Sequence, residues 1–325
     1  MRFGGPLPWS GHHSTRDKIR TFAQEIEAAG FEWVTAGEHL FYPKDLRTPH
    51  PRSGKLPLDP TQQSHETFTL FAWLAASTTT LRFMSAMTVV PYRSPFVTAK
   101  LAAGLDYLSD GRFILGAAGG WMEEEFEALH LPFAERGAIT DEFLAIISAI
   151  FAGTGPVDGR FSSLPEAWVE PRPVQQPLPI VIGGRDVGPV MRRVVRFGHG
   201  WWPYPMNAAQ IAAAMPRMRE MWAVGGRAGE PLEVHSYLRV PLDQESGVRL
   251  VTRAELLDQI GALAEAGVTH VTMTFDELGT PAGGPPLDAV ADAARWFAAD
   301  VLPMTRRSVD APPRAGGSRV RRGAL

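Results

Sequence analysis

The sequence predicts an α/β fold, a (β/α)8 TIM barrel with insertions after its second and fourth strands. Short apolar runs suited to buried strands alternate with longer segments of helical periodicity along residues 1–303. Eight such pairs are expected, and parallel neighbouring strands require crossover helices of this kind. The chain has 325 residues, 45% of them apolar, which suffices for one barrel of about 250 residues plus insertions.

The expected strands are short and mostly apolar, and the expected helices fill the gaps between them. The strands are residues 2–5, 31–36, 81–90, 113–115, 179–182, 198–202, 232–240 and 268–275. The helices are residues 15–29, 67–76, 94–109, 122–129, 138–152, 186–196, 208–224, 252–266 and 287–301. Ser14 or Thr15 can cap the first helix, and Gly30 can end it. Pro95 suits the first turn of the third helix, and Thr252 can cap the helix after the seventh strand.

The stretch from residue 105 to residue 121 shows the strongest local pattern. Leucines at helical spacing lead into Ser109-Asp110-Gly111, a turn that can end the helix. Phe113 to Leu115 then suits a strand buried on both faces. In Gly116 to Trp121, small residues leave the backbone bare at the carboxyl end of that strand. Barrels bind their ligands at such ends, although close packing of helix on strand would also explain the small residues.

Two segments and the C-terminal end depart from the barrel pattern. Residues 41–63 contain five prolines and no periodicity. A loop of this length usually serves as a lid or a binding loop, with a passive surface insertion as the alternative. Residues 153–176 are irregular and rich in proline as well. We therefore expect a single barrel domain over residues 1–303 and a disordered Arg-, Pro- and Gly-rich tail over residues 304–325.

Composition excludes several classes of protein. A net charge of −3 gives no basic excess that would suggest nucleic acid as a partner. The absence of cysteine rules out disulfides, thiolate nucleophiles and cysteine-ligated metal sites. The N-terminus lacks the layout of a signal peptide, and the longest apolar run, residues 143–152, is too short to cross a bilayer. We expect a soluble, cytoplasmic protein that binds neither nucleic acid nor membrane.

The carboxyl ends of the expected strands carry aromatic, glycine and histidine residues. Because parallel strand ends share one mouth, these distant loops should converge there. They contribute Trp9, the His12-His13 pair, Glu38, His39, Thr88, Gly119-Gly120-Trp121, Gly183-Gly184-Arg185 and Trp201-Trp202. The set has few ionisable groups and no identifiable pair of nucleophile and base, so a planar redox cofactor fits it better than hydrolysis does. No His-x-His pattern occurs, and no metal site is expected.

Five segments, in this order, resemble the bacterial luciferase-like monooxygenase family. They are AGFEWVTAGEHL (29–40), LRFMSAMTVVPYRSPFVTAKLAAGLD (81–106), SDGRFILG followed by GGWMEEEFEALHLPFAERG (109–137), PIVIGG (179–184) and FGHGWWP (197–203). The superfamily contains flavin-dependent monooxygenases and oxidoreductases that use coenzyme F420, a deazaflavin. The resemblance implies the barrel fold and a cofactor of this kind, but no particular substrate.

The resemblance also implies a cofactor site at the mouth, with coenzyme F420 as the first choice and FMN as the alternative. Its residues are Glu38, His39, Ser85, Ala86, Thr88, Gly119, Gly120, Ile182, Gly183, Gly184 and Arg185. In the family, the glycines that match Gly183 and Gly184 receive the cofactor phosphate. The N–H groups of a helix N-terminus together with Arg185 would suit an anion, although a plain strand-to-helix turn has the same pattern. A non-prolyl cis peptide at Ser85–Ala86 is expected from the same resemblance.

His39 is the candidate catalytic residue. A lone histidine is more often a core residue bonded to a neighbouring carbonyl, but a position beside Glu38 at a strand end favours the mouth. The resemblance implies a place near the deazaflavin ring, where the matching histidine of F420-dependent relatives is proposed to bind substrate or move a proton. An imidazole can do either near neutral pH.

The expected substrate pocket contains Trp9, His12, Trp121 and Trp202. Some F420-dependent sugar-phosphate dehydrogenases of the family carry an acidic residue where this chain has Trp121, which favours an apolar or aromatic substrate here. The leading hypothesis is hydride transfer between coenzyme F420 and a small organic molecule. The alternatives are a monooxygenase that uses reduced FMN and a non-catalytic cofactor-binding protein. A homodimer is expected.

Overall fold

The computed structural model describes residues 1–9, 15–51, 54, 64–243, 246–275 and 287–307. Nine strands lie in this part of the chain. They are β1 (Arg2–Gly4), β2 (Trp33–Ala36), β3 (Arg82–Ser85), β4 (Thr88–Val89), β5 (Phe113–Ala118), β6 (Ile180–Gly183), β7 (Gly200–Trp202), β8 (Glu233–Arg239) and β9 (His270–Thr274).

The strands form one closed, parallel ring. Their order is β1-β9-β8-β7-β6-β5-β3-β2, with β4 also paired to β5. A parallel bridge between Gly5 and Val34 joins β2 back to β1. Because β3 and β4 share the third place, the ring has eight positions, and the predicted (β/α)8 barrel is confirmed.

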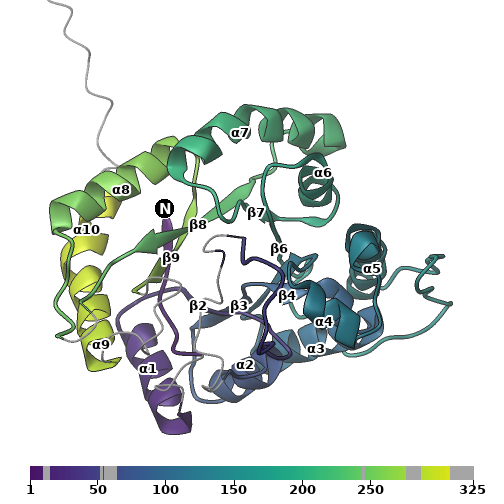
Figure 1. The fold of residues 1–325 in the computed structure, drawn as a ribbon, viewed down its shortest axis with the longest axis horizontal. Helices are drawn as coiled ribbons and strands as arrows, with labels where there is room; N and C mark the ends of the chain where they lie inside the picture. The colour runs from purple at the N-terminus through teal and green to yellow at the C-terminus, as the bar shows by residue number, and fades with distance from the viewer. Residues whose placement is uncertain (10–14, 52–53, 55–63, 244–245, 276–286, 308–325) are drawn as a thin grey trace, which may run out of the picture.

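Helices surround the ring of strands, as Figure 1 shows. They are α1 (Arg16–Ala28), α2 (Thr67–Ala75), α3 (Pro95–Leu108), α4 (Glu123–Ala128), α5 (Arg136–Ala152), α6 (Gly188–Phe197), α7 (Ala208–Trp222), α8 (Arg253–Glu265), α9 (Leu287–Trp296) and α10 (Leu302–Arg307). No helix in the described part of the chain is long and apolar enough to cross a membrane.

The helix ends agree with the sequence signals in part. Thr252 caps α8 through a reciprocal capping box with Glu255. Thr15 occupies the N-cap position of α1, but its side chain makes no capping hydrogen bond. Wider helical turns over Phe297–Val301 connect α9 to α10. The helical backbone therefore runs four residues past the expected domain end at residue 303, and residues 308–325 of the expected tail lie outside the described chain.

Two layers of apolar side chains bury the strands. Inside the ring, one cluster consists of Trp33, Met84, Ile114, Val181 and Trp202. Outside it, the alternate strand residues pack against the helices in a larger core. Burial on both faces explains why the strands appear in the sequence as continuous apolar runs.

The third barrel strand is interrupted between β3 and β4. The Ser85 hydroxyl donates to the carbonyl oxygen of Gly116 and accepts from its N–H, both at 3.0 Å. A Cβ at Gly116 would collide with the Ser85 carbonyl oxygen, so the close approach requires glycine. The non-prolyl cis peptide lies at Ala86–Met87, and the prediction of Ser85–Ala86 is wrong by one residue. Ser85 still pairs with Ala36 in the regular register of β2 and β3, and the irregular backbone begins only after it.

Candidate active site

Loops from several strand ends bring an aromatic cluster together at the mouth of the barrel. His39, three residues after β2, has its ring centroid 5.2 Å from that of Tyr42 and 5.6 Å from that of Trp121. Trp121, beyond the end of β5, also meets the ring of His50 edge-on at 5.0 Å. On the neighbouring side, a Cβ at Gly37 would lie 3.1 Å from the ring of Trp9. His39, Trp121 and Trp9 therefore lie at the carboxyl ends of the strands, as expected.

A buried carboxylate, Glu125 of α4, contacts the ring of His39 at Nδ1. Its Oε2 lies 3.0 Å from His39 Nδ1 and accepts a hydrogen bond of 2.5 Å from the Tyr92 hydroxyl. Its Oε1 accepts from the backbone N–H of Leu40, also at 2.5 Å. The Glu125 side chain is fully buried, whereas that of His39 remains 13% exposed. Burial, followed by the charge of Glu125, raises the pKa of Tyr92, which therefore stays protonated and acts as a donor.

A second buried carboxylate, Glu38, holds the backbone around β4. It accepts from the N–H of Val89 at 2.6 Å and forms an ion pair with Arg93. Burial raises the pKa of Glu38, although Arg93 opposes that shift. The guanidinium of Arg93 also lies over the ring of Phe68. Both carboxylate oxygens thus have protein partners, and Glu38 supports the mouth rather than offering its side chain to a ligand.

The start of the insertion after β2 is fastened to α4. Glu124 accepts from the backbone N–H groups of Arg47 and Thr48, at 2.6 and 3.0 Å. Arg47 also forms an ion pair with Glu127. Burial acts to raise the pKa of Glu124, but hydrogen bonds led by those from Thr48 outweigh it and lower the pKa to about 2. The described part of the insertion is therefore bound to the mouth through the same helix that carries Glu125.

The expected cofactor residues of β3, β4 and β6 differ in whether their side chains are free to bind a ligand. The Ser85 hydroxyl is used by Gly116, and the Ile182 side chain points outward into the helix-facing core. Ala86 is half-buried beside the mouth. Thr88 Oγ1 and Arg93 Nη1 are buried, and neither has a hydrogen-bond partner among the described residues. Two unsatisfied donors next to the mouth are what a polar ligand could satisfy.

The glycines at the strand ends have no side chains of their own, but side chains of other residues lie close to them. Gly120 has φ +79°, and a Cβ there would lie 2.7 Å from Val89. A Cβ at Gly183 would lie 2.9 Å from Met87 Cγ, so Met87 covers this strand end. Gly184 has φ +138°, and its N–H donates to Trp202 O at 3.0 Å.

After β6, where the resemblance implies a site for the cofactor phosphate, the backbone offers fewer free N–H donors than the sequence indicates. The helix predicted to follow Arg185 is present as α6, but it begins only at Gly188, with Pro189 in its first turn. Since the Gly184 N–H is already bonded and proline has no N–H, fewer backbone donors remain for an anion. Arg185 is exposed, and Gly119 is half-buried. An anion at this place would depend on the Arg185 charge more than the sequence indicated.

Of the two remaining expected pocket residues, the structure describes Trp202 alone. His12 falls outside the described residues. Trp202 is buried inside the barrel, where it stacks on His235 at 5.7 Å and packs against Tyr237 at 4.8 Å. Among the described residues of the expected pocket, Trp9 and Trp121 therefore lie at the mouth, and Trp202 lies in the interior.

A second group of ionisable residues, which sequence reasoning missed, lies inside the barrel. His235 and His270 stack at 4.5 Å with an angle of 16° between their rings. The side chain of Glu233 lies 3.2 Å from His235 Nε2 and 3.8 Å from His270 Nε2. Burial lowers the pKa of both histidines, that of His270 to about 3.

The spacing of this group would suit a metal, but its geometry does not. The three possible ligand atoms lie within 4.8 Å of one another. A metal must lie close to the plane of each imidazole that binds it, and two nearly parallel, stacked rings cannot both meet this condition. Arg2 and Arg82 are also close enough to lower the pKa of His270. The arrangement fits two neutral imidazoles sharing one carboxylate.

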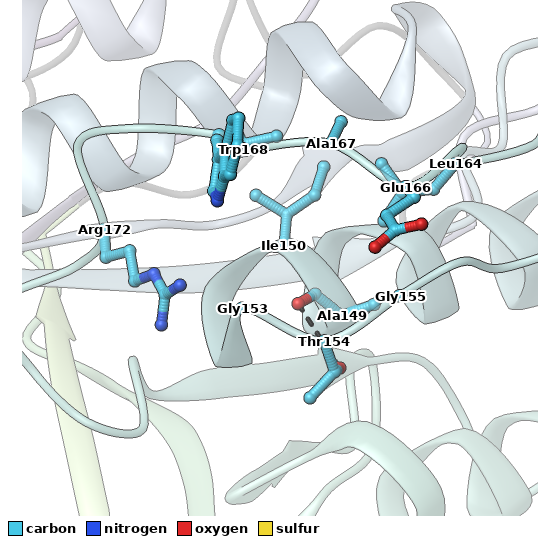
Figure 2. Close-up of a pocket in the computed structure, with 11 residues that line it drawn as sticks. Ala149, Ile150, Gly153, Thr154, Gly155, Leu164, Glu166, Ala167, Trp168 and Arg172 are labelled. Atoms are coloured by element: carbon cyan, nitrogen blue, oxygen red, sulfur yellow. Dashed lines mark hydrogen bonds between the residues drawn. The ribbon is translucent and has the colours of Figure 1, made fainter.

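A cavity of about 210 Å³ lies elsewhere, between the end of α5 and the segment over residues 153–172. Figure 2 shows Trp168 and Arg172 on one side of it and Thr154 on the other. None of the expected site residues lines this cavity. It is therefore separate from the mouth.

Sequence reasoning missed the polar residues that support the mouth. Tyr92, Arg93 and Glu125 lie within the segments that carry the family resemblance. The only signal for Glu125 was the run Glu123-Glu124-Glu125, which resembles a solvated helix face. In the structure, the last two residues of that run are buried. A periodicity argument cannot distinguish members of a three-residue run on a six-residue helix.

The fold and the mouth together define a class of protein: a parallel barrel whose strand ends carry an imidazole, aromatic rings and glycine-rich loops. The family model for luciferase-like monooxygenases matches residues 1–276, and the chain belongs to that family. Rv0940c, an uncharacterised protein of Mycobacterium tuberculosis, is 29% identical over 256 residues, which cover 78% of this chain and 83% of the relative.

Solved structures agree on the fold. Monooxygenase RslO1 from Streptomyces bottropensis has a TM-score of 0.73 at 20% identity, covering 94% of this chain and 100% of that one. An F420-dependent secondary alcohol dehydrogenase, solved with an F420–acetone adduct, has a TM-score of 0.72 at 15% identity, with 94% and 99% covered. Riboflavin lyase RcaE, solved with modified FMN and riboflavin, has a TM-score of 0.71 at 15% identity, with 96% and 93% covered. The fold is thus compatible with both kinds of cofactor.

Proposed function

We propose that the protein is an oxidoreductase that uses coenzyme F420 and acts on a small apolar or aromatic molecule. One observation supports this most strongly: His39 lies at the mouth with Glu125 behind Nδ1 and the edge of Trp121 beside its ring. The position is that of the histidine which the resemblance places near the deazaflavin. One structural relative that depends on F420 and another solved with modified FMN share this fold.

The residues around the mouth fit a planar cofactor. Ala86 and Met87 would face the ring, and the buried Thr88 hydroxyl has no hydrogen-bond partner among the described residues and could donate to the cofactor. The exposed Arg185 would meet the phosphate end. When bound, the deazaflavin would supply a two-electron hydride donor or acceptor.

The chain's own residues would bind the substrate and handle its proton. The half-buried rings of Trp9 and Trp121 would form apolar walls beside the substrate. His39 would orient the substrate or exchange a proton with it through Nε2, the ring nitrogen that Glu125 does not occupy. No charged side chain stands where Trp121 does, which favours a substrate without a phosphate group.

The test is a titration of the purified protein with F420 and with FMN side by side, followed by visible absorbance. We expect saturable binding of F420 and markedly weaker binding of FMN. An Arg185→Gln variant should weaken F420 binding, because it removes the exposed charge at the phosphate end. Binding of FMN alone would favour the monooxygenase alternative, and F420 binding without turnover on any carbonyl or enone would indicate a carrier.

We also propose that the protein is a homodimer. The outer face of α3 exposes Val97, Leu101 and Leu108, spaced for one helical stripe, with Gly104 between them. Because the stripe carries no charge, a second copy of the chain that presents the same stripe is the partner that we propose for it. Light scattering of Leu101→Glu should then show a monomer where the parent shows a dimer. A monomeric parent would contradict the proposal.

A further inference from the structure

We infer that Glu125 is the positioning residue of His39, and that it holds the neutral imidazole as the tautomer with its proton on Nδ1. The inference concerns a property of the protein without cofactor. Its catalytic meaning rests on the proposed function, but the hydrogen-bond pattern that carries it does not.

The partners of Glu125 leave only one role for His39. Leu40 N–H donates to Oε1, and the Tyr92 hydroxyl donates its single proton to Oε2. A carboxylate accepts hydrogen bonds and has no proton to give. The contact of 3.0 Å between Oε2 and His39 Nδ1 is therefore a hydrogen bond only if Nδ1 carries a proton. Because the Glu125 side chain is fully buried, losing one of these donors would leave a buried carboxylate oxygen less well satisfied.

The fixed tautomer determines which nitrogen can react. With Nδ1–H bound to Glu125, the lone pair of the neutral ring belongs to Nε2. Tyr42 and Trp121 pack against the ring and restrict its rotation. The Nδ1 bond exists in both the neutral and the protonated ring. Nε2 can consequently gain or release a proton without any rearrangement of the ring.

The substitution Glu125→Gln tests the tautomer directly. It replaces one accepting carboxylate oxygen by a donating amide group and leaves the volume of the side chain almost unchanged. Leu40 N–H is a backbone donor, so the amide oxygen of the glutamine must face it. The amide NH₂ then occupies the place of Oε2 and donates toward His39 Nδ1. The ring can accept this bond only if its proton moves to Nε2. The tautomer should therefore invert.

The experiment is ¹⁵N NMR of histidine-labelled protein without cofactor, at a pH where His39 is neutral, with its signals identified by their loss in His39→Gln. We expect Nδ1–H in the parent and Nε2–H in Glu125→Gln. Tyr92→Phe should keep Nδ1–H, because it leaves the bond between Glu125 and His39 intact. Glu127→Gln is the matched control, an exposed glutamate of the same helix whose partner is Arg47, and it should also keep Nδ1–H. An Nε2–H tautomer in the parent overturns the inference even if no variant folds.

Turnover provides a separate readout. If F420 chemistry occurs at the mouth, Glu125→Gln should lower kcat about 10²-fold with little change in KM. The double variant with His39→Ala should be no slower than His39→Ala alone, because Glu125 acts through the imidazole. Additive losses would overturn the positioning role. If the parent shows Nδ1–H but does not react with F420, the proposed function fails while the tautomer assignment stands.

Discussion

Histidine is paired with glutamate in two places in the molecule, and the two places differ in which partner is buried. At the mouth, the carboxylate of Glu125 is fully buried and the imidazole of His39 reaches the surface. Inside the barrel, the imidazoles of His235 and His270 are buried, whereas about a third of the Glu233 side chain is exposed.

The difference shows how burial decides what such a pair can do. A buried carboxylate with three donors holds its histidine in one orientation and leaves a nitrogen for a ligand. Two buried, stacked imidazoles have their pKa lowered and remain neutral, so they fill space like aromatic rings. The first arrangement suits chemistry, and the second suits a core.

The largest expected effect is on turnover. His39→Ala should lower saturated turnover by about 10²–10⁴-fold with F420, while the affinity for F420 changes far less. His270→Gln should leave both unchanged, because its ring faces the barrel interior. If His39→Ala instead weakens F420 binding and leaves saturated turnover normal, His39 only lines the pocket.

The next effect separates the two regions by stability. Trp33→Ala should lower the free energy of unfolding by about 3–5 kcal/mol, because this fully buried ring packs against both interior histidines. Thr272→Val is the control, since it removes only the hydrogen bond from Trp33 Nε1 and should cost about 1 kcal/mol. Denaturant unfolding measures both. If Trp33→Ala lowers the free energy of unfolding by less than about 1 kcal/mol, Trp33 does not pack in the barrel interior as the structure shows.

A smaller effect concerns pH. The pKa of His270 is about 3 in the folded chain, below its ordinary value near 6.5, so the unfolded chain binds a proton that the folded one does not. The stability from this group is fully present above pH 6.5 and is lost as the pH falls toward 3. His270→Gln should reduce the slope of unfolding free energy against pH by up to about 1.4 kcal/mol per pH unit. An equal slope in the variant would contradict burial of a neutral imidazole.

A suitable control for that slope is His130→Asn. His130 is exposed and has φ +56°, a conformation that asparagine tolerates.

The smallest effect is local to the mouth. Glu124→Gln should speed hydrogen exchange at the amides of Arg47 and Thr48, because both donate to the same carboxylate oxygen. Global stability should fall by only about 1 kcal/mol. Unchanged exchange at both amides would show that α4 does not hold this loop.

The sequence predicted the architecture well and the site only in part. Alternating strand and helix patterns locate all eight barrel positions, because periodicity and crossover rules depend on local residues. Glu125, Tyr92 and Met87 escaped prediction, because their roles come from contacts between distant loops. Trp202 was predicted to line the substrate pocket because it ends a strand. In the structure its side chain points into the barrel interior and stacks on His235.

The most direct measurement is a titration with F420 of protein whose histidines carry ¹³C in their rings. If the mouth is the cofactor site, the signals of His39 should move with saturation, while those of His235 and His270 stay in place. Movement of the two interior histidines without His39, or no movement at all under saturating F420, would contradict the assignment of chemistry to the mouth.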